Sequence, residues 1–190
     1  EVSKKYLICG YLDTMKKFSV LRGDSYFVLG DEDPLRAHFL SLEEESRIEA
    51  LRLLGLVGVE GETAEYHYYR EFIPWLESIA KQPYSRTCHL VTGMLEEMAA
   101  FLQIERLVPY SPSSLMFEVI KAFSAAKFES ERDLRYMTRY KKLFNFLEFI
   151  DDRKPCTSEL STEFRSFEEE FQKSVGLLEQ ICSQQSRISH

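Results

Sequence analysis

The hydrophobic positions between Ser85 and Val108 recur at alternating steps of three and four residues. The members of this stripe are Cys88, Val91, Leu95, Met98 and Leu102, with Met94 and Phe101 widening it. This is the period of an amphipathic helix with one broad buried face, so the pattern predicts a helix over 85–108. Three carboxylates fall off the stripe, and we expect them to face solvent: Glu96, Glu97 and Glu105.

Other stretches of the chain repeat this period, and together they predict an all-α fold. We expect a single-domain helical bundle of about seven or eight helices over 1–190, with the helix at 85–108 in its centre. Residues 56–62 are the loosest part of the first half and mark a candidate weak subdivision. The C-terminal tail, 183–190, is expected to fray.

Capping residues mark where several helices begin. Asp33 precedes Pro34, which suits the first helical position because its missing N–H is not needed there. Further caps are predicted at Ser41, as a capping box with Glu44, and at Thr63, Ser111, Ser130 and Ser161. Pro74 interrupts the helix that follows Thr63, so we expect a kink or two short helices there.

Residues 18–29 can either extend the preceding helix or form a small hairpin. The helical pattern of residues 2–17 ends near Lys17, and Arg22-Gly23-Asp24-Ser25 then lies between two short hydrophobic runs, which is typical of a small N-terminal hairpin. Arg22-Gly23-Asp24 is also a tripeptide that some integrins recognise. Because Gly23 is sufficiently explained as a turn or a helix cap, we assign it a structural role.

Composition and charge narrow the class of protein. Of 190 residues, 44% are hydrophobic and 29% are charged, which is ordinary for a globular chain and argues against disorder. The net charge is −7, so a nucleic acid is not the expected partner. Acidic runs at 31–33, 43–45 and 168–170 form either a solvated surface or a docking face for a basic partner.

The four cysteines contain no CxxC pair and suit reduced, small hydrophobic side chains. We therefore predict an intracellular protein, cytoplasmic or nuclear, with a secreted disulfide-bonded bundle as the alternative. The chain has no apolar run long enough to span a membrane.

A search for catalytic chemistry gives little. The chain has no glycine-rich phosphate loop, GxSxG elbow or HExxH motif. Glu65, His67 and Glu71 do not have the Glu-x-x-His spacing of a helical di-metal site, so we expect no metal and no cofactor. Cys88 and His89 are adjacent on a helix and point about 100° apart, so they cannot act as a nucleophile–base pair. An enzyme is the less favoured class, but a helical enzyme or small-ligand carrier built from scattered residues remains an alternative.

A nucleic-acid-binding module is the other alternative. Residues 47–72 loosely resemble the end of a winged helix and its wing, which implies either DNA binding or protein contact. A separate basic cluster comprises Arg132, Arg135, Arg139, Lys141 and Lys142. The acidic balance of the chain counts against both.

The leading hypothesis is a non-enzymatic interaction or adaptor domain that acts within a larger assembly. It rests on an aromatic segment, predicted to bind a protein partner: Tyr66, Tyr68, Tyr69, Phe72 and Trp75. Tyrosine and tryptophan are enriched at interface hot spots, and a basic or amphipathic helical segment would suit the acidic chain. Some of these rings must belong to the core, and we expect Trp75 and Tyr66 to be the buried ones.

Overall fold

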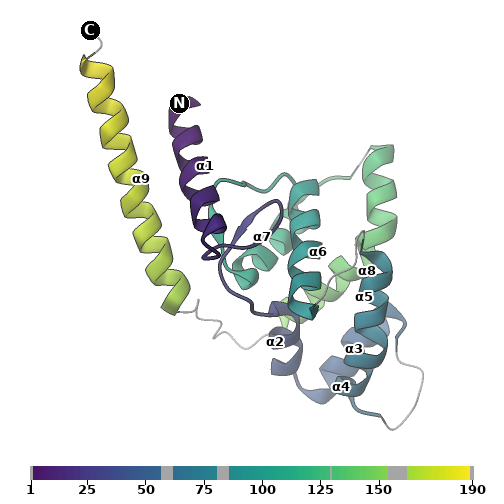
Figure 1. Cartoon of the computed structure of the whole chain (residues 1–190). Coiled ribbons are helices and arrows are strands. Elements are labelled where there is room, and N and C mark those ends of the chain that lie inside the picture. The colour runs from purple at the N-terminus through teal and green to yellow at the C-terminus, as the bar shows by residue number, and fades with distance from the viewer. Residues whose placement is uncertain (1, 57–61, 81–85, 129, 154–161, 189–190) are drawn as a thin grey trace.

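The computed structural model describes residues 2–56, 62–80, 86–128, 130–153 and 162–188, and its fold is all-α, as predicted (Figure 1). The elements in chain order are α1 (Val2–Lys17), β1 (Phe27–Val28), α2 (Pro34–Ser41), α3 (Glu44–Leu54), α4 (Ala64–His67), the π-helix η1 (Tyr68–Phe72), α5 (Ile73–Ile79), α6 (Thr87–Phe101), β2 (Pro109–Tyr110), α7 (Pro112–Ala125), α8 (Glu131–Asp152) and α9 (Thr162–Ile188). The candidate subdivision near 56–62 falls largely on residues outside the described ranges, and the predicted cap at Ser161 falls there too.

Three of the predicted helix starts are confirmed by their hydrogen bonds, whereas the capping box at Ser41 is wrong, because Glu43 is the N-cap of α3 and the Ser41 hydroxyl donates to the His38 carbonyl. Asp33 Oδ1 accepts from the Arg36 backbone N–H at 3.0 Å, with Pro34 in the first turn of α2. Ser111 and Ser130 each form a reciprocal capping box at the start of α7 and α8. Such caps satisfy backbone donors that the first helical turn leaves free, which is why they can be recognised locally.

The central helix, α6, is shorter than predicted. It runs from Thr87 to Phe101, and Gln103 then takes a positive φ of 58° before the chain extends into β2. Ser85 lies outside the described residues. Val91, Leu95 and Met98 are buried in the main core, as the stripe predicts.

Pro74 neither breaks nor splits its helix. Among the described residues, α4, η1 and α5 form one continuous helical run, with the π-turn directly before the proline. The π-helix η1 has a different hydrogen-bond register from an α-helix. Proline donates no backbone N–H, so it can follow this change of register without ending the helical run. The expected interruption therefore takes the form of a local change in helical register.

The predicted N-terminal hairpin is present only as one isolated antiparallel bridge, between Arg22 and Val28. Arg22 and Val28 exchange two backbone hydrogen bonds of 2.7 and 3.0 Å, which closes a tight loop over 22–28. The β1 strand then pairs in parallel with β2, Phe27 opposite Pro109. This short ladder joins the N-terminal loop to the segment that follows α6.

A second, smaller core joins the two ends of the chain. Its buried members are Leu12, Leu21, Phe27 and Phe171. The α1 and α9 helices run antiparallel, with both termini at one end of the molecule (Figure 1), and the rings of Tyr11 and Phe171 lie 6.1 Å apart.

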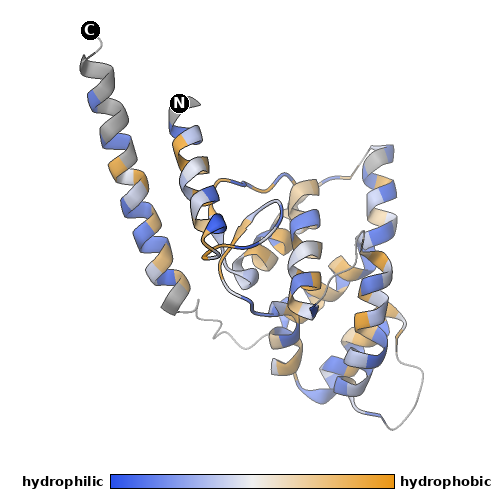
Figure 2. Cartoon of the chain, viewed as in Figure 1, coloured by the Kyte–Doolittle hydropathy of each residue, from blue (hydrophilic) through white to orange (hydrophobic). Residues whose placement is uncertain are grey.

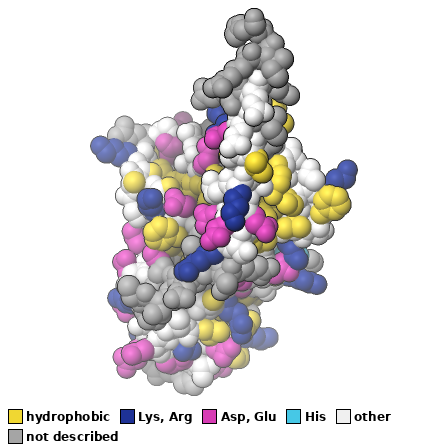
Figure 3. Space-filling view, turned by 90° about the vertical axis from the view of Figure 1, so that its left-hand side faces the viewer, with side chains coloured by type: hydrophobic (Ala, Val, Ile, Leu, Met, Phe, Trp, Pro, Cys, Tyr) yellow, Lys and Arg dark blue, Asp and Glu magenta, His cyan; other side chains and the backbone are white. Residues whose placement is uncertain are grey.

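The α9 helix is amphipathic along its length. Figure 2 shows it as mostly hydrophilic, with hydrophobic residues recurring along it. On the side of the molecule shown in Figure 3, acidic and basic side chains are interspersed with hydrophobic ones. The helical backbone of α9 continues to Ile188, and the fraying expected from residue 183 stays a prediction.

Candidate partner-binding site

The predicted partner-binding segment spans α4, η1 and α5, and its aromatic rings face in different directions. Tyr66 and Tyr69 are 42% and 45% exposed, whereas Tyr68 and Phe72 are only 1% and 0% exposed. Trp75 is half-buried against the main core. The expectation that Tyr66 is a core residue is therefore wrong, and any direct partner contact on this segment falls to Tyr66, Tyr69 and the accessible part of Trp75.

Tyr68 and Phe72 belong to a stack of aromatic rings inside the domain. The Tyr68 ring centroid is 4.9 Å from that of Phe39 on α2, and the Phe72 centroid is 5.0 Å from that of Phe146 on α8. Both residues lie in the π-helix, and they are four residues apart, a spacing that puts two side chains on one face of a regular helix as well.

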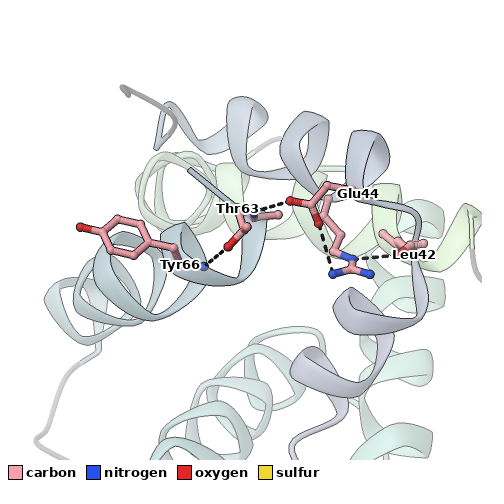
Figure 4. Close-up of polar contacts among 6 residues, drawn as sticks. Leu42, Glu44, Thr63 and Tyr66 are labelled. Carbon is pink, nitrogen blue, oxygen red and sulfur yellow. Dashed lines mark hydrogen bonds and ion pairs between the residues drawn. The ribbon is translucent and has the colours of Figure 1, made fainter. Parts of the chain in front are cut away.

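The start of α4 is fixed to α3 by a polar network (Figure 4). Glu44 Oε1 accepts from the Ala64 backbone N–H at 2.6 Å, and its other oxygen pairs with Arg47 at 3.3 Å. Thr63 Oγ1 accepts from the Tyr66 backbone N–H at 3.3 Å, which is the predicted cap. Figure 4 shows the Tyr66 ring pointing away from this network, so its backbone is anchored while its side chain stays accessible.

Arg36 of α2 holds the second exposed tyrosine. Its Nε donates to the Tyr69 hydroxyl at 2.5 Å, and its guanidinium carbon lies 5.9 Å from the Tyr69 ring centroid. We call Arg36, Tyr66 and Tyr69 together the Tyr66–Tyr69 surface. It places two tyrosines and an arginine on a frame of packed helices.

Polar atoms without partners lie close to this surface. The Tyr68 hydroxyl is buried and has no hydrogen-bond partner among the described residues, and the same is true of Asp33 Oδ2. Burial raises the pKa of Tyr68 well above its ordinary value, with the nearby Asp33 charge adding to the effect. Burial also raises the pKa of Asp33.

A buried carboxylate on α6 is the main polar feature that the sequence analysis missed. Glu96 is 4% exposed, so the expectation that it faces solvent is wrong. It accepts backbone N–H groups from Asp24, Ser25 and Tyr26 at 2.9, 3.0 and 2.7 Å. Burial raises the pKa of Glu96, although these three donors act in the opposite direction. The turn signal at Gly23 was visible in the sequence, but its partner on α6 was not.

The same loop and helix enclose a pocket of about 170 Å³. Arg22, Asp24 and Asp31 line it from the loop, and His89, Thr92 and Glu96 line it from α6. Cys88 also lines this pocket and is a free thiol.

Among the residues that the structure describes, no group of three or more His, Cys, Asp or Glu side chains is placed to hold a metal ion. His67 is fully buried, and its Nδ1 lies 3.3 Å from Glu71 Oε2. Neither ring nitrogen has a hydrogen-bond partner within the described ranges.

Three members of the basic cluster on α8 make contacts within the chain. Arg135 pairs with Glu131 on its own helix. Arg139 donates to the Ile79 carbonyl, and Lys142 Nζ donates to the Leu54 carbonyl at 3.3 Å. The bonds of Arg139 and Lys142 tie α8 to α5 and α3.

The winged-helix resemblance is not supported by the described part of residues 47–72. A wing requires strands, but residues 64–72 lie in α4 and η1. Comparisons with protein-family models, with curated proteins and with solved structures found no match to the chain. Over the residues that the structure describes, none of the helices combines the length and the hydropathy needed to cross a membrane.

Proposed function

We propose that this chain is a non-enzymatic protein-interaction domain, an adaptor within a larger assembly, that contacts its partner through the Tyr66–Tyr69 surface. The proposal rests on the exposure of Tyr66 and Tyr69, 42% and 45%, on one helical run whose other aromatic residues are buried, as Tyr68 and Phe72 are, or half-buried, as Trp75 is. The two residues are only three positions apart on this run, so one partner segment can reach both rings.

The chemistry of this surface is that of an interface hot spot. Tyrosine and arginine are over-represented among residues that dominate binding energy, and here Arg36 is bonded to Tyr69. Two side chains that are already held in place lose less conformational entropy on binding than free ones. This preorganisation supports a role in recognition.

The partner we expect carries an amphipathic helix with basic residues. Its apolar side would contact the two tyrosine rings, and its basic side chains would be attracted by a chain of net charge −7. The free thiols of Cys9 and Cys88 fit a reducing, intracellular compartment.

Site-specific photo-crosslinking tests this proposal. A benzophenone amino acid replaces Tyr66 or Tyr69 in the full chain, which is irradiated in extract of its native source. Replacement of Tyr6 on α1 serves as the matched control, because that tyrosine is 74% exposed on another part of the molecule. We expect one protein to be crosslinked from positions 66 and 69 and not from position 6. Equal yields from all three positions, or none from 66 and 69, would overturn the proposal.

A further inference from the structure

The pocket between the 22–31 loop and α6 has a size and a charge that define its ligand. Its volume of about 170 Å³ can accommodate the end of one long side chain. We propose that it receives the guanidinium of an arginine side chain presented by a protein partner. This site is separate from the Tyr66–Tyr69 surface and does not depend on it.

The charged groups that line the pocket carry a net negative charge. They comprise three carboxylates, on Asp24, Asp31 and Glu96, and one guanidinium, on Arg22. The lining therefore attracts a cation and repels phosphate or carboxylate groups. Thr92 adds a neutral hydroxyl on the α6 side, which can accept a hydrogen bond from a guanidinium N–H.

The pocket already contains one guanidinium contact within the chain. Arg22 forms an ion pair with Asp31 across the loop, and the two side chains are 46% and 40% exposed. Asp31 is thus oriented to bind a guanidinium, and a second one can share or take over this carboxylate. Exposed ion pairs are weak, so this exchange has a low cost.

The walls are held in place before any ligand binds. Glu96 fixes the loop to α6 through three backbone N–H groups, of which that of Tyr26 is buried. Arg22 and Val28 close the loop by two further backbone bonds. A ligand therefore does not have to order the loop, which is a large part of the usual cost of binding.

An NMR titration of the full chain with N-acetyl-arginine amide tests the inference, and N-acetyl-citrulline amide serves as the uncharged control of nearly equal shape. We expect the arginine probe to shift the backbone amides of Gly23, Gly30 and Thr92 in a saturable way, and the citrulline probe to leave them unchanged. No shifts, or equal shifts with both probes, would overturn the inference.

Two variants then move the affinity in opposite directions. Asp31→Asn removes a carboxylate and should weaken binding at least about threefold, whereas Arg22→Gln removes the competing guanidinium and should strengthen it. The control is Glu49→Gln, which removes an equal charge from α3 outside the pocket and should leave the affinity unchanged. If Asp31→Asn and Glu49→Gln weaken binding equally, the effect is one of net charge and the pocket assignment is wrong. Tyr66 and Tyr69 remain intact in every variant, so failure here leaves the crosslinking result independent.

Discussion

Gly23 lies so close to Glu96 that a β-carbon on Gly23 would stand 2.5 Å from Glu96 Oε1. The glycine has a φ of +88°, in the left-handed region that other residues rarely adopt. This close approach lets one buried carboxylate reach the backbone N–H groups of Asp24, Ser25 and Tyr26. The pair thereby holds the N-terminal loop against the central helix.

Gly23→Ala should destabilise the fold, because the left-handed backbone alone costs an alanine about 1–2 kcal/mol and the added carbon displaces Glu96. Urea denaturation measures the loss in free energy of unfolding. Gly10→Ala is the matched control. Apart from the backbone of its own helix, no described atom lies within 4 Å of where a β-carbon on Gly10 would stand, and alanine in an α-helix should stabilise by about 0.5–1 kcal/mol. Equal effects of the two substitutions would contradict the Gly23–Glu96 contact.

The stability of the chain should depend on pH through Glu96. Burial raises its pKa above the ordinary 4.5, so the folded state binds the proton more tightly than the unfolded state. The contribution of Glu96 to the free energy of unfolding therefore falls as pH rises from 4.5 through the raised pKa. Glu96→Gln removes this titration. We expect the free energy of unfolding of the native chain, relative to that of the variant, to be higher at pH 4 than at pH 7.

The opposite trend, a native chain that gains stability over Glu96→Gln as pH rises, would show that the three N–H donors outweigh burial. The comparison is specific to Glu96, because Asp33 and the other carboxyl groups titrate in both proteins and cancel in the difference.

His67→Leu should leave the fold as stable as the native chain or stabilise it by about 1 kcal/mol. The imidazole is fully buried and neither nitrogen is hydrogen-bonded to a described residue, so leucine avoids the cost of burying two polar atoms. Glu71 is partly exposed and can be hydrated once its neighbour is gone. Thermal unfolding measures the effect, and a loss of several kcal/mol would mean that the imidazole makes a polar contact worth more than its burial costs.

We expect Phe72→Ala to lower the stability of the fold much more than Tyr66→Ala, because Phe72 is a core residue and Tyr66 is a surface residue. Phe72 is fully buried among aromatic rings, so its truncation should cost about 3–5 kcal/mol. Tyr66 is 42% exposed, and its truncation should change stability by no more than about 0.5 kcal/mol. Chemical denaturation of both variants checks this contrast, and comparable losses would place Tyr66 in the core after all.

Features set by neighbouring residues were predictable from the sequence. The Asp33–Pro34 start, the Ser111 and Ser130 caps and the apolar stripe around Leu95 all depend on residues a few positions apart. The all-α fold follows from these local patterns.

Features that depend on distant residues were not predictable. Glu96 looked like a solvent-facing carboxylate because its donors, including Tyr26, lie far away in the chain. Tyr68 and Phe72 looked like surface residues because the rings that cover them, on Phe39 of α2 and Phe146 of α8, also lie far away in the chain. The pocket was missed because the 22–31 loop and α6 meet only in the folded chain.

The central claim, partner binding through the Tyr66–Tyr69 surface, is tested most directly by quantitative capture. The immobilised native chain, the Tyr66→Ala/Tyr69→Ala double variant and a Tyr6→Ala control are each exposed to nuclease-treated extract of the native source. Mass spectrometry measures the yield of every stoichiometric partner, and circular dichroism confirms that all three proteins are folded. We expect the native chain and the control to retain the same partner, and the double variant to lose it at least about tenfold. Full recovery of that partner on the folded double variant would contradict the claim.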